Sequence, residues 1–313
     1  MKRYSIIIIG VLLLLLAACR QSSVPLPVSQ GQPYEVCVAG DADSAMYGVL
    51  SAPMEGLPQP EPMFDVRCID SLRFESKMRL LRNLLVVRID SNRKNAVTLR
   101  YEQNRYAHPQ MIVYIEAGSA NELKTYAQKR KEQIRQLFEL HEYDNAIVSL
   151  ARRNNPQAER MIAEMFGYKM LVPADMTSHR CGKDFIWLSN NATQGLQNLC
   201  IYKLKGIAEP SIFRTDSVLR ANIKGETDDM YMRTVARSTT DRVLTYRQRR
   251  YRLQRGLWEM EGDAMGGPFV RRFIADSIKD ETLVVEAFVY APEMKKRNKL
   301  RQIEAVLLTV KHI

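Results

Sequence analysis

The sequence predicts an α+β protein with two lobes, each an antiparallel or mixed sheet packed with helices, preceded by a signal peptide and a tether. Apolar and β-branched runs of the length of a strand occur in both halves of the chain, and patterns of capped amphipathic helices lie between them. The N-terminus carries an export signal. We expect four segments: a lipoprotein signal peptide at 1–18, a lipid anchor and Pro-rich tether at 19–62, a first lobe at 63–168 and a second lobe at 169–313.

The N-terminus has the layout of a bacterial lipoprotein signal. Lys2 and Arg3 precede an apolar run that ends in Leu-Ala-Ala-Cys at residues 16–19. The run is shorter than the roughly 20 apolar residues of a membrane-spanning helix. Its last four residues resemble the lipobox, in which the cysteine is acylated, with palmitate among its chains, and becomes the first residue. We therefore predict Cys19 as the lipidation site, through which membrane lipid holds the mature protein.

The residues after Cys19 bear on location. Arg20 to Ser23 include neither the Asp that favours inner-membrane retention of lipoproteins nor an acidic run that favours surface export. We expect an outer-membrane anchor with the body in the periplasm.

The mature chain is basic. Losing Lys2 and Arg3 with the signal lowers the formal charge by two, from +11 to +9. A basic surface attracts anions, so the expected partners are anionic glycan, peptidoglycan or envelope proteins, and export argues against nucleic acid.

The elements of the first half follow from periodicity and caps. Seven prolines between residues 25 and 62 indicate the tether, in which Glu35–Ala39 is compatible with a first edge strand. A helical pattern with Leu72, Met78 and Leu81 begins at Ser71. We expect strands at 84–89, 97–101 and 111–115, a long helix that begins with the capping box Ser119/Glu122 and extends through Phe138, and a helix from Asn155 and Pro156 to Gly167.

Two short similarities indicate that the lobes are related. Arg67-Cys68 matches Arg180-Cys181 at an offset of 113 residues from Cys68 to Cys181, and the strand from Asn83 matches the one from Asn198 at an offset of 115. After Asp241, long strands are predicted at 243–253, 256–261, 268–275 and 283–290, and then a helix at 294–307.

The stretch from Arg255 to Phe273 contains the candidates for catalysis. Strand alternation places Trp258, Met260, Phe269 and Phe273 on one apolar face, joined by a glycine-rich hairpin loop at 262–267. The alternative function is an envelope glycan hydrolase that uses Glu259, Glu261 and Asp263. The backbones of Glu259 and Glu261 would lie roughly 6.5–7 Å apart, which is compatible with glycosidase carboxylate spacings of about 5–9.5 Å.

A non-catalytic binding or scaffolding role is the leading prediction. The chain has no G-x-S-x-G, no H-E-x-x-H and no phosphate-binding glycine loop, and we expect no cofactor. Arg247, Arg249, Tyr251 and Arg252 form the densest basic and aromatic patch. On one strand the first three share a face and Arg252 lies on the other, which favours an anionic ligand over guanidinium groups. The alternative is a solvated strand whose arginine stems cover apolar neighbours.

Four cysteines remain beyond Cys19: Cys37, Cys68, Cys181 and Cys200. An even number in an exported protein is compatible with disulfides, for which three pairings exist. The alternative is that they are small buried residues. No C-x-x-C spacing occurs, so we predict no metal site.

Several segments together resemble a known family. They are the lipobox, the strand Asn83 to Arg88, the segment Asp184 to Leu188, and above all Gly256-Leu257-Trp258 with the loop and strand from Gly262 to Val270. The chain is similar, over nearly all of its mature length, to the Bacteroidota lipoproteins of domain of unknown function 4837. The resemblance implies an envelope lipoprotein, but it carries over neither a reaction nor functional residues.

Overall fold

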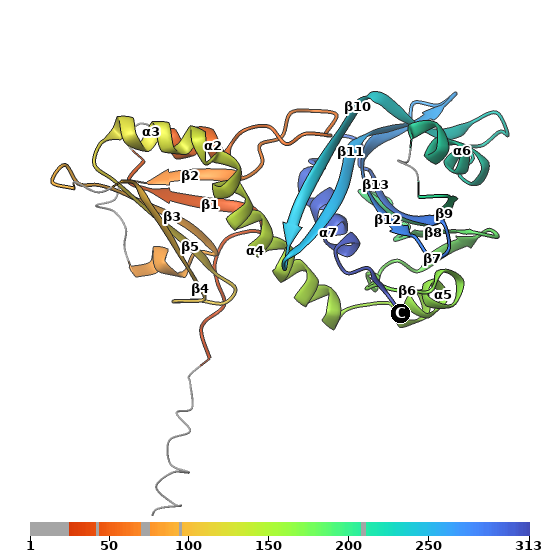
Figure 1. Cartoon of the computed structure of the whole chain (residues 1–313), viewed down its shortest axis with the longest axis horizontal. Coiled ribbons are helices and arrows are strands. Elements are labelled where there is room, and N and C mark those ends of the chain that lie inside the picture. The colour runs from red at the N-terminus through yellow and green to blue at the C-terminus, as the bar shows by residue number, and fades with distance from the viewer. Residues whose placement is uncertain (1–24, 42–43, 70–75, 94–95, 208–210) are drawn as a thin grey trace, which may run out of the picture.

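The computed structural model describes residues 25–41, 44–69, 76–93, 96–207 and 211–313. It confirms the α+β class and the two sheet-rich lobes, which lie side by side and are bridged by the long helix α4 (Figure 1). Cys19, the signal peptide and Leu72 lie outside the described residues. In the described ranges, no helix is both long enough and apolar enough to cross a bilayer.

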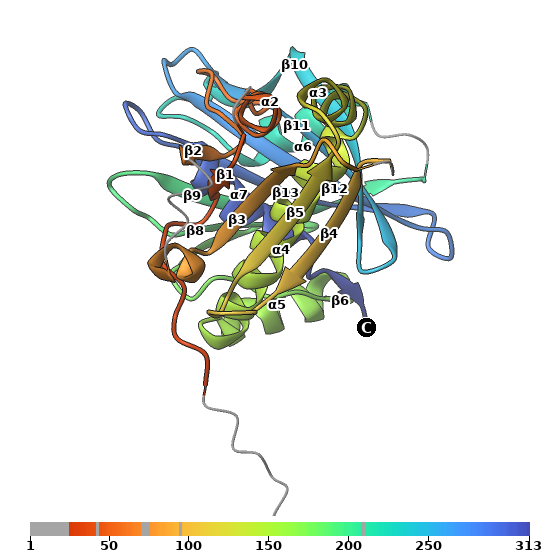
Figure 2. The same cartoon turned by 90° about the vertical axis from the view of Figure 1, so that its left-hand side faces the viewer.

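The first lobe is a five-stranded sheet with the order β2-β1-β3-β5-β4, in which only β4 is antiparallel to its neighbour. Helices α2, α3 and α4 cover the face toward the second lobe, and Figure 2 shows the opposite face free of long helices. The elements are β1 (Glu35–Ala39), α2 (Ala45–Leu50), β2 (Asp65–Ile69), the 3-10 helix η2 (Ser76–Leu80), β3 (Asn83–Ile89), β4 (Thr98–Gln103), β5 (Met111–Ala117), α3 (Ala120–Lys129) and α4 (Lys131–Arg152).

The folded body begins earlier than predicted. β1 is an interior strand between β2 and β3 and not an edge strand in a tether. Val36 and Val38 are fully buried on the face that packs against the helices. Burying both valines and pairing both strand edges holds this segment in the sheet. The residues from Glu35 onward therefore belong to the first lobe, which the sequence placed at 63–168.

The capping box at Ser119 is confirmed with one difference. The Ser119 side chain accepts a hydrogen bond from the Glu122 amide at 3.3 Å, while the Glu122 carboxylate accepts one from the Gly118 amide at 3.0 Å. The predicted single long helix is two helices. Arg130 has non-helical dihedrals (φ −114°, ψ 14°), which separate α3 on the first sheet from α4, which reaches the second lobe.

The second lobe is a seven-stranded antiparallel sheet with the order β10-β11-β12-β13-β9-β8-β7. Helix α7 and α4 pack on one face, and α6 packs on the other. The elements are α5 (Pro156–Phe166), β6 (Tyr168–Lys169), β7 (Ser178–Cys181), β8 (Phe185–Ser189), β9 (Leu196–Lys205), α6 (Ile212–Asn222), β10 (Tyr231–Tyr246), β11 (Arg249–Glu261), β12 (Gly266–Asp276), β13 (Glu281–Tyr290), α7 (Arg297–Leu307) and β14 (Lys311–His312).

The two lobes do not share a topology, so the predicted relation between them is wrong. The strand from Asn83 lies in a parallel arrangement between β1 and β5, whereas the strand from Asn198 lies in an antiparallel one between β8 and β13. The short sequence similarities arise because both strands are buried and therefore have a similar apolar composition. The predicted strand at 243–253 is also two strands, because the chain reverses at Arg247 and Gln248 between β10 and β11.

The two lobes share one continuous apolar core, whose buried residues run along the chain from Tyr34 in the first lobe to Val310 in the second. Polar contacts reinforce it. The Glu61 carboxylate accepts hydrogen bonds from the amides of Lys296 (2.7 Å) and Arg297 (3.1 Å), and so caps the start of α7 from the first lobe. A carboxylate at a helix N-terminus also interacts favourably with the helix dipole. The lobes are therefore packed as one body.

Candidate functional site: a basic and aromatic pocket

A pocket of about 810 Å³ lies where the end of α4 meets α5, β6, the β10–β11 turn and the segment after α7. This volume falls within the roughly 300–1,000 Å³ typical of small-molecule sites. The lining residues combine apolar, aromatic and cationic side chains: Ile147, Pro156, Glu159, Arg160, Ala163, Lys169, Met170, Leu171, Tyr246, Arg247, Arg249, Tyr251, Leu308, Thr309 and Lys311. The cavity and these lining residues form the basic pocket.

The β10–β11 turn forms one wall of the basic pocket and is fixed to α4. Arg247 and Gln248 have positive φ angles of 48° and 63°, as in the two-residue turns that usually require Gly or Asn. Asp144 of α4 holds the turn, because its carboxylate accepts hydrogen bonds from the Tyr246 hydroxyl (2.6 Å) and from Arg247 (2.8 Å). Burial and the bond to Asp144 raise the pKa of the Tyr246 hydroxyl. Asp144 offsets the strain of this backbone, about 1–2 kcal/mol per residue.

Helix α5 forms the opposite wall. It begins as predicted, because the Asn155 side chain accepts a hydrogen bond from the Ala158 amide at 3.1 Å and Pro156 occupies the first turn. Its end is also as predicted, at Gly167 with a φ of 77°. The Glu159 carboxylate accepts hydrogen bonds from the Val172 amide (3.1 Å) and from Asn154 (2.9 Å). These bonds hold α5 against the chain that follows it.

Two lysines face one another at the rim of the basic pocket. Lys169 of β6 and Lys311 of β14 are directly opposite in the antiparallel register. Side chains in such positions have Cβ atoms about 4.5–5.5 Å apart, and like charges there are destabilising. Both side chains are exposed. An anion bound between them would remove this repulsion.

The charges of the basic pocket are unbalanced. Arg160, Lys169, Arg249 and Lys311 are exposed, and among the described residues none of them forms an ion pair with a carboxylate. Met170, Tyr246 and Tyr251 are buried beneath them. The site therefore has a cationic rim over an apolar and aromatic floor.

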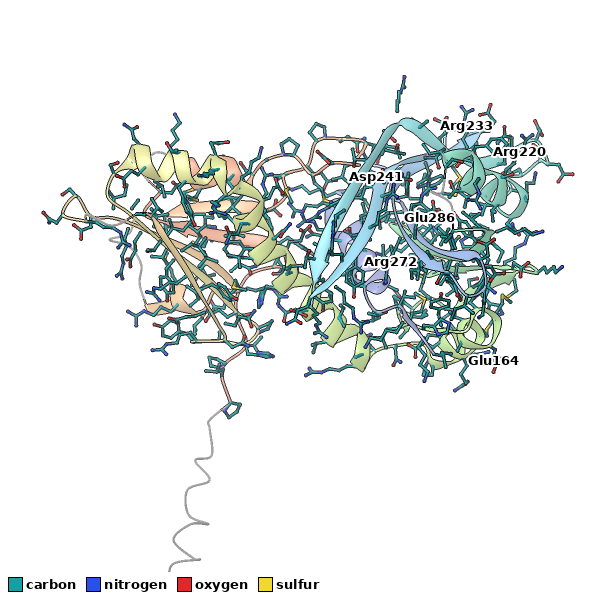
Figure 3. The ribbon with its side chains drawn as sticks, viewed as in Figure 1. Glu164, Arg220, Arg233, Asp241, Arg272 and Glu286 are labelled. Atoms are coloured by element: carbon teal, nitrogen blue, oxygen red, sulfur yellow. The ribbon has the colours of Figure 1, made fainter. Side chains whose placement is uncertain are left out.

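A further arginine lies behind the floor. Arg272 places its guanidinium carbon 4.4 Å from the centre of the Tyr251 ring and donates a hydrogen bond to the Leu307 carbonyl at 2.6 Å. Burial lowers the pKa of Arg272 to about 10, and the nearby charge of Arg249 adds to this effect. No carboxylate among the described residues forms an ion pair with Arg272. Figure 3 shows Arg272 in the second lobe, and its side chain is half-buried.

The structure brings together three of the four residues predicted to bind an anion. Arg249 and Tyr251 share a face of β11, and Arg247 reaches the pocket from the turn rather than from a strand. Arg252 points to the other face, where it lies 3.4 Å from Asp241 and does not line the pocket. Sequence reasoning missed Arg160, Lys169 and Lys311, because these residues come from segments far apart in the chain.

The candidate catalytic carboxylates lie elsewhere. Glu259 and Glu261 both form ion pairs with Arg233, at 2.7 Å and 2.8 Å, and their side chains are about 40% exposed. Asp263 is exposed in the turn and accepts a hydrogen bond from the Ala264 amide at 2.6 Å. Figure 3 shows Arg233 at the end of β10, away from Arg272. None of the three carboxylates lines either described pocket, so the arrangement does not favour acid–base chemistry.

A second cluster of charges is buried beneath α6. Arg271 and Glu286 are both fully buried, 3.4 Å apart, and Glu286 also accepts a hydrogen bond from the Tyr202 hydroxyl at 2.9 Å. Burial raises the pKa of Glu286, against the opposing charge of Arg271. Figure 3 shows Glu286 within the sheet. Because neither residue lines a described pocket, this pair is part of the core.

The apolar face predicted around Trp258 is confirmed. Trp258, Met260 and Phe269 are buried in one cluster with Phe273 packed against it, beneath α6. The Trp258 ring lies edge-on to Phe288, with 5.2 Å between ring centroids. The stretch from Arg255 to Phe273 is therefore a structural hairpin.

The four cysteines of the body are free thiols in the structure. In β1 and β2, Cys68 is paired with Val38, so it lies on the opposite sheet face from Cys37. Cys181 is paired with Ile186, whereas Cys200 is paired with Trp187, and this places Cys181 and Cys200 on opposite faces too. The register thus prevents a disulfide within either pair. Within the described residues, no group of three or more potential metal ligands occurs.

Comparisons with known proteins divide the chain where the lobes meet. Residues 155–309 match a family described as Domain of unknown function (DUF4837), and residues 29–151 match a separate one, Domain of unknown function (DUF8532). The resemblance noted in the sequence thus covers the second lobe and not nearly the whole mature chain. No curated protein matches.

Solved structures give only distant similarity. One is the crystal structure of the Saccharomyces cerevisiae Ran-binding protein Mog1p, with 10% identity, a TM-score of 0.31, and coverage of 47% of this chain and 90% of that one. Another is a point mutant of Mog1, with 10% identity, a TM-score of 0.30, and coverage of 47% and 91%. The second lobe, residues 155–309, belongs to the family of Domain of unknown function (DUF4837).

Proposed function

We propose that this protein is a lipid-anchored, non-catalytic binding protein of the cell envelope, with its body in the periplasm, and that the basic pocket holds an anionic ligand. The observation that carries the proposal is the charge imbalance of the pocket. Among the described residues, Arg160, Lys169, Arg249 and Lys311 form no ion pair with a carboxylate, and Lys169 directly faces Lys311. A cluster of this kind concentrates anions and is relieved by binding one.

The chemistry of the lining supports binding rather than catalysis. It contains no His, Cys or Ser. Its one carboxylate, Glu159, is engaged with the Val172 amide and Asn154, and the Thr309 hydroxyl donates to the Val306 carbonyl at 2.7 Å. Guanidinium groups suit phosphate and carboxylate oxygens. The pocket thus offers donors and apolar surface, without a nucleophile and base in contact.

Anions should stabilise the protein through this site. Binding to the folded state raises the melting temperature by mass action. We expect inorganic phosphate or an oligogalacturonate to raise it in the wild type and to have little effect in Lys169→Glu/Arg249→Glu. The control, Lys124→Glu/Lys131→Glu, changes two exposed lysines of α3 and α4 by the same total charge. Equal anion responses in all three proteins would contradict a binding role for the pocket.

Anchoring is tested separately at Cys19. With an alanine there, no acyl chain can be attached, and a hydrophobic anchor is worth about 0.8 kcal/mol per buried methylene. We expect Cys19→Ala to move the protein from the membrane pellet to the soluble fraction after cell fractionation. Cys68→Ala, which removes an exposed thiol of the body, should leave it in the pellet. A Cys19→Ala protein that stays in the pellet after a salt wash would refute lipid anchoring.

A further inference from the structure

We infer that the ligand of the basic pocket is an anionic amphiphile, that is, an acyl or alkyl chain that carries a phosphate or carboxylate head group. This inference rests on the proposed function and narrows it to one ligand class. Three features carry it: the kind of polar group at the rim, the apolar floor, and the arginine behind that floor.

The rim offers donors and few acceptors. Its free polar groups are the cations of Arg160, Lys169, Arg249 and Lys311. The acceptors nearby are already used, because Asp144 binds Tyr246 and Arg247, and Glu159 binds backbone and Asn154. A glycan presents many hydroxyl groups, each of which needs acceptors as well as donors. A phosphate or carboxylate needs only donors, so it matches this rim better.

The floor offers apolar surface. Ile147 and Leu171 are half-buried and line the cavity together with Met170, Tyr246, Tyr251 and Leu308, whose side chains are largely buried beneath it. An inorganic ion would contact only the rim and would leave the apolar floor in contact with water. Burying a methylene group there contributes about 0.8 kcal/mol. A ligand with an apolar chain would therefore use the part of the pocket that a bare anion leaves empty.

Arg272 joins the two parts. It stacks on Tyr251 from behind and is held by the Leu307 carbonyl at 2.6 Å. Its position adds positive potential under the floor and fixes the ring against which the chain would pack. An anion at the rim would interact with the charge of Arg272 in addition to the charges of the four rim cations. The distances from the anion to these four cations depend on their flexible side chains.

The test is a titration of the full chain held in phosphatidylcholine nanodiscs, by calorimetry, with empty nanodiscs titrated as the blank. The probes are butyl and octyl phosphate, which share a head group, inorganic phosphate, octyl glucoside, which has the same chain without charge, and an oligogalacturonate. The proteins are the wild type, Lys169→Glu/Arg249→Glu, and the control Lys124→Glu/Lys131→Glu.

We expect octyl phosphate to bind the wild type at least tenfold more tightly than butyl phosphate, and octyl glucoside to bind at least tenfold more weakly than octyl phosphate. The pocket variant should lose at least tenfold in affinity for octyl phosphate, and the control variant less than twofold. An unchanged circular dichroism spectrum and a melting temperature no lower than that of the wild type would show that both variants are folded, as exposed positions predict.

Each contrary result identifies what fails. Equal affinity for octyl, butyl and inorganic phosphate would refute an amphiphilic ligand and indicate a site that recognises charge alone. Equal affinity for octyl glucoside and octyl phosphate would also refute it and indicate a site that recognises apolar surface alone. Binding of the oligogalacturonate that depends on Lys169 and Arg249, without such binding of octyl phosphate, would also overturn it and would retain the proposed anion site. If neither anion depends on these two residues, the proposed function itself fails.

Discussion

Replacing Glu139 by glutamine is expected to lower the free energy of unfolding by about 3–5 kcal/mol, the cost of breaking a buried ion pair by removing one partner. Glu139 of α4 is fully buried where the lobes meet. It is paired with Arg242 of β10 and lies 3.7 Å from Arg255 and 3.6 Å from Arg301. Among the described residues, one further carboxylate belongs to this cluster, that of Glu304, which pairs with Arg255 at 2.6 Å. Without Glu139, the buried Arg255 and Arg301 and the half-buried Arg242 would share a single carboxylate.

Urea denaturation of the purified chain measures this effect. The matched control is Glu259→Gln, which removes a carboxylate whose side chain is 41% exposed and should change stability by less than about 1 kcal/mol. A loss for Glu139→Gln as small as that of the control would contradict the role of this cluster in joining the lobes.

The same carboxylate gives a pH signature. Burial acts to raise the pKa of Glu139, but the hydrogen bond from Arg242 and the charges of Arg301 and Arg255 outweigh it and lower the pKa to about 2. Since the pKa in the fold lies below the ordinary value of 4.5, its contribution to stability is complete above about pH 4.5. It is lost as the pH falls toward 2. Glu139→Gln should show a smaller loss of stability over this interval than the wild type.

Replacing Gly267 by alanine is the second change with a large expected effect. Gly267 pairs with Trp258 across β11 and β12. A Cβ atom there would lie 2.0 Å from the Val289 carbonyl oxygen and 3.2 Å from Trp258 Nε1. That oxygen also accepts the Trp258 indole hydrogen bond at 3.3 Å. The backbone of β13 would have to move, at a cost of about 3 kcal/mol from overpacking and the weakened bond.

Gly48 provides the control for this substitution. It is exposed in α2, and a Cβ atom there would meet nothing within 4 Å. Gly48→Ala should raise stability by about 0.5–1 kcal/mol, because alanine is the better helix former. If Gly267→Ala unfolds at the same urea concentration as the wild type, the close approach of β12 and β13 does not limit which residue can occupy position 267, and the prediction is wrong.

Local patterns predicted the parts of the fold that depend on neighbouring residues. The caps at Ser119 and Asn155, the C-terminal Gly167, and the apolar face of Trp258 and Phe269 are all found as predicted. In each of these, the residues that determine the structure lie within one element or one hairpin. Their physical chemistry is therefore visible in a short stretch of sequence.

The errors arose where tertiary contacts override local signals. Arg247 and Gln248 form a tight turn without the Gly or Asn that normally marks one, because Asp144, about 100 residues earlier, holds it. The prolines around β1 predict a tether, yet β1 pairs with β2 and β3, and the helices on the sheet bury Val36 and Val38. The apparent repeat reflected similar strand composition in unlike sheets.

Only part of the candidate site could be predicted from the sequence, for the same reason. Arg247, Arg249 and Tyr251 are neighbours in the sequence, so their clustering could be predicted. Lys169 and Lys311 become neighbours only when β6 pairs with β14. The charge imbalance, which carries the proposed function, exists only in the folded chain.

Photochemical crosslinking tests the ligand site most directly. An octyl phosphate that carries a diazirine in its chain would be bound to the full chain in phosphatidylcholine nanodiscs, irradiated, and its attachment points mapped by mass spectrometry. We predict labels at 156–171 and 246–251, and their loss in Lys169→Glu/Arg249→Glu but not in Lys124→Glu/Lys131→Glu. Labels confined to the first lobe, or equally strong in all three proteins, would contradict the assignment of the basic pocket as the binding site.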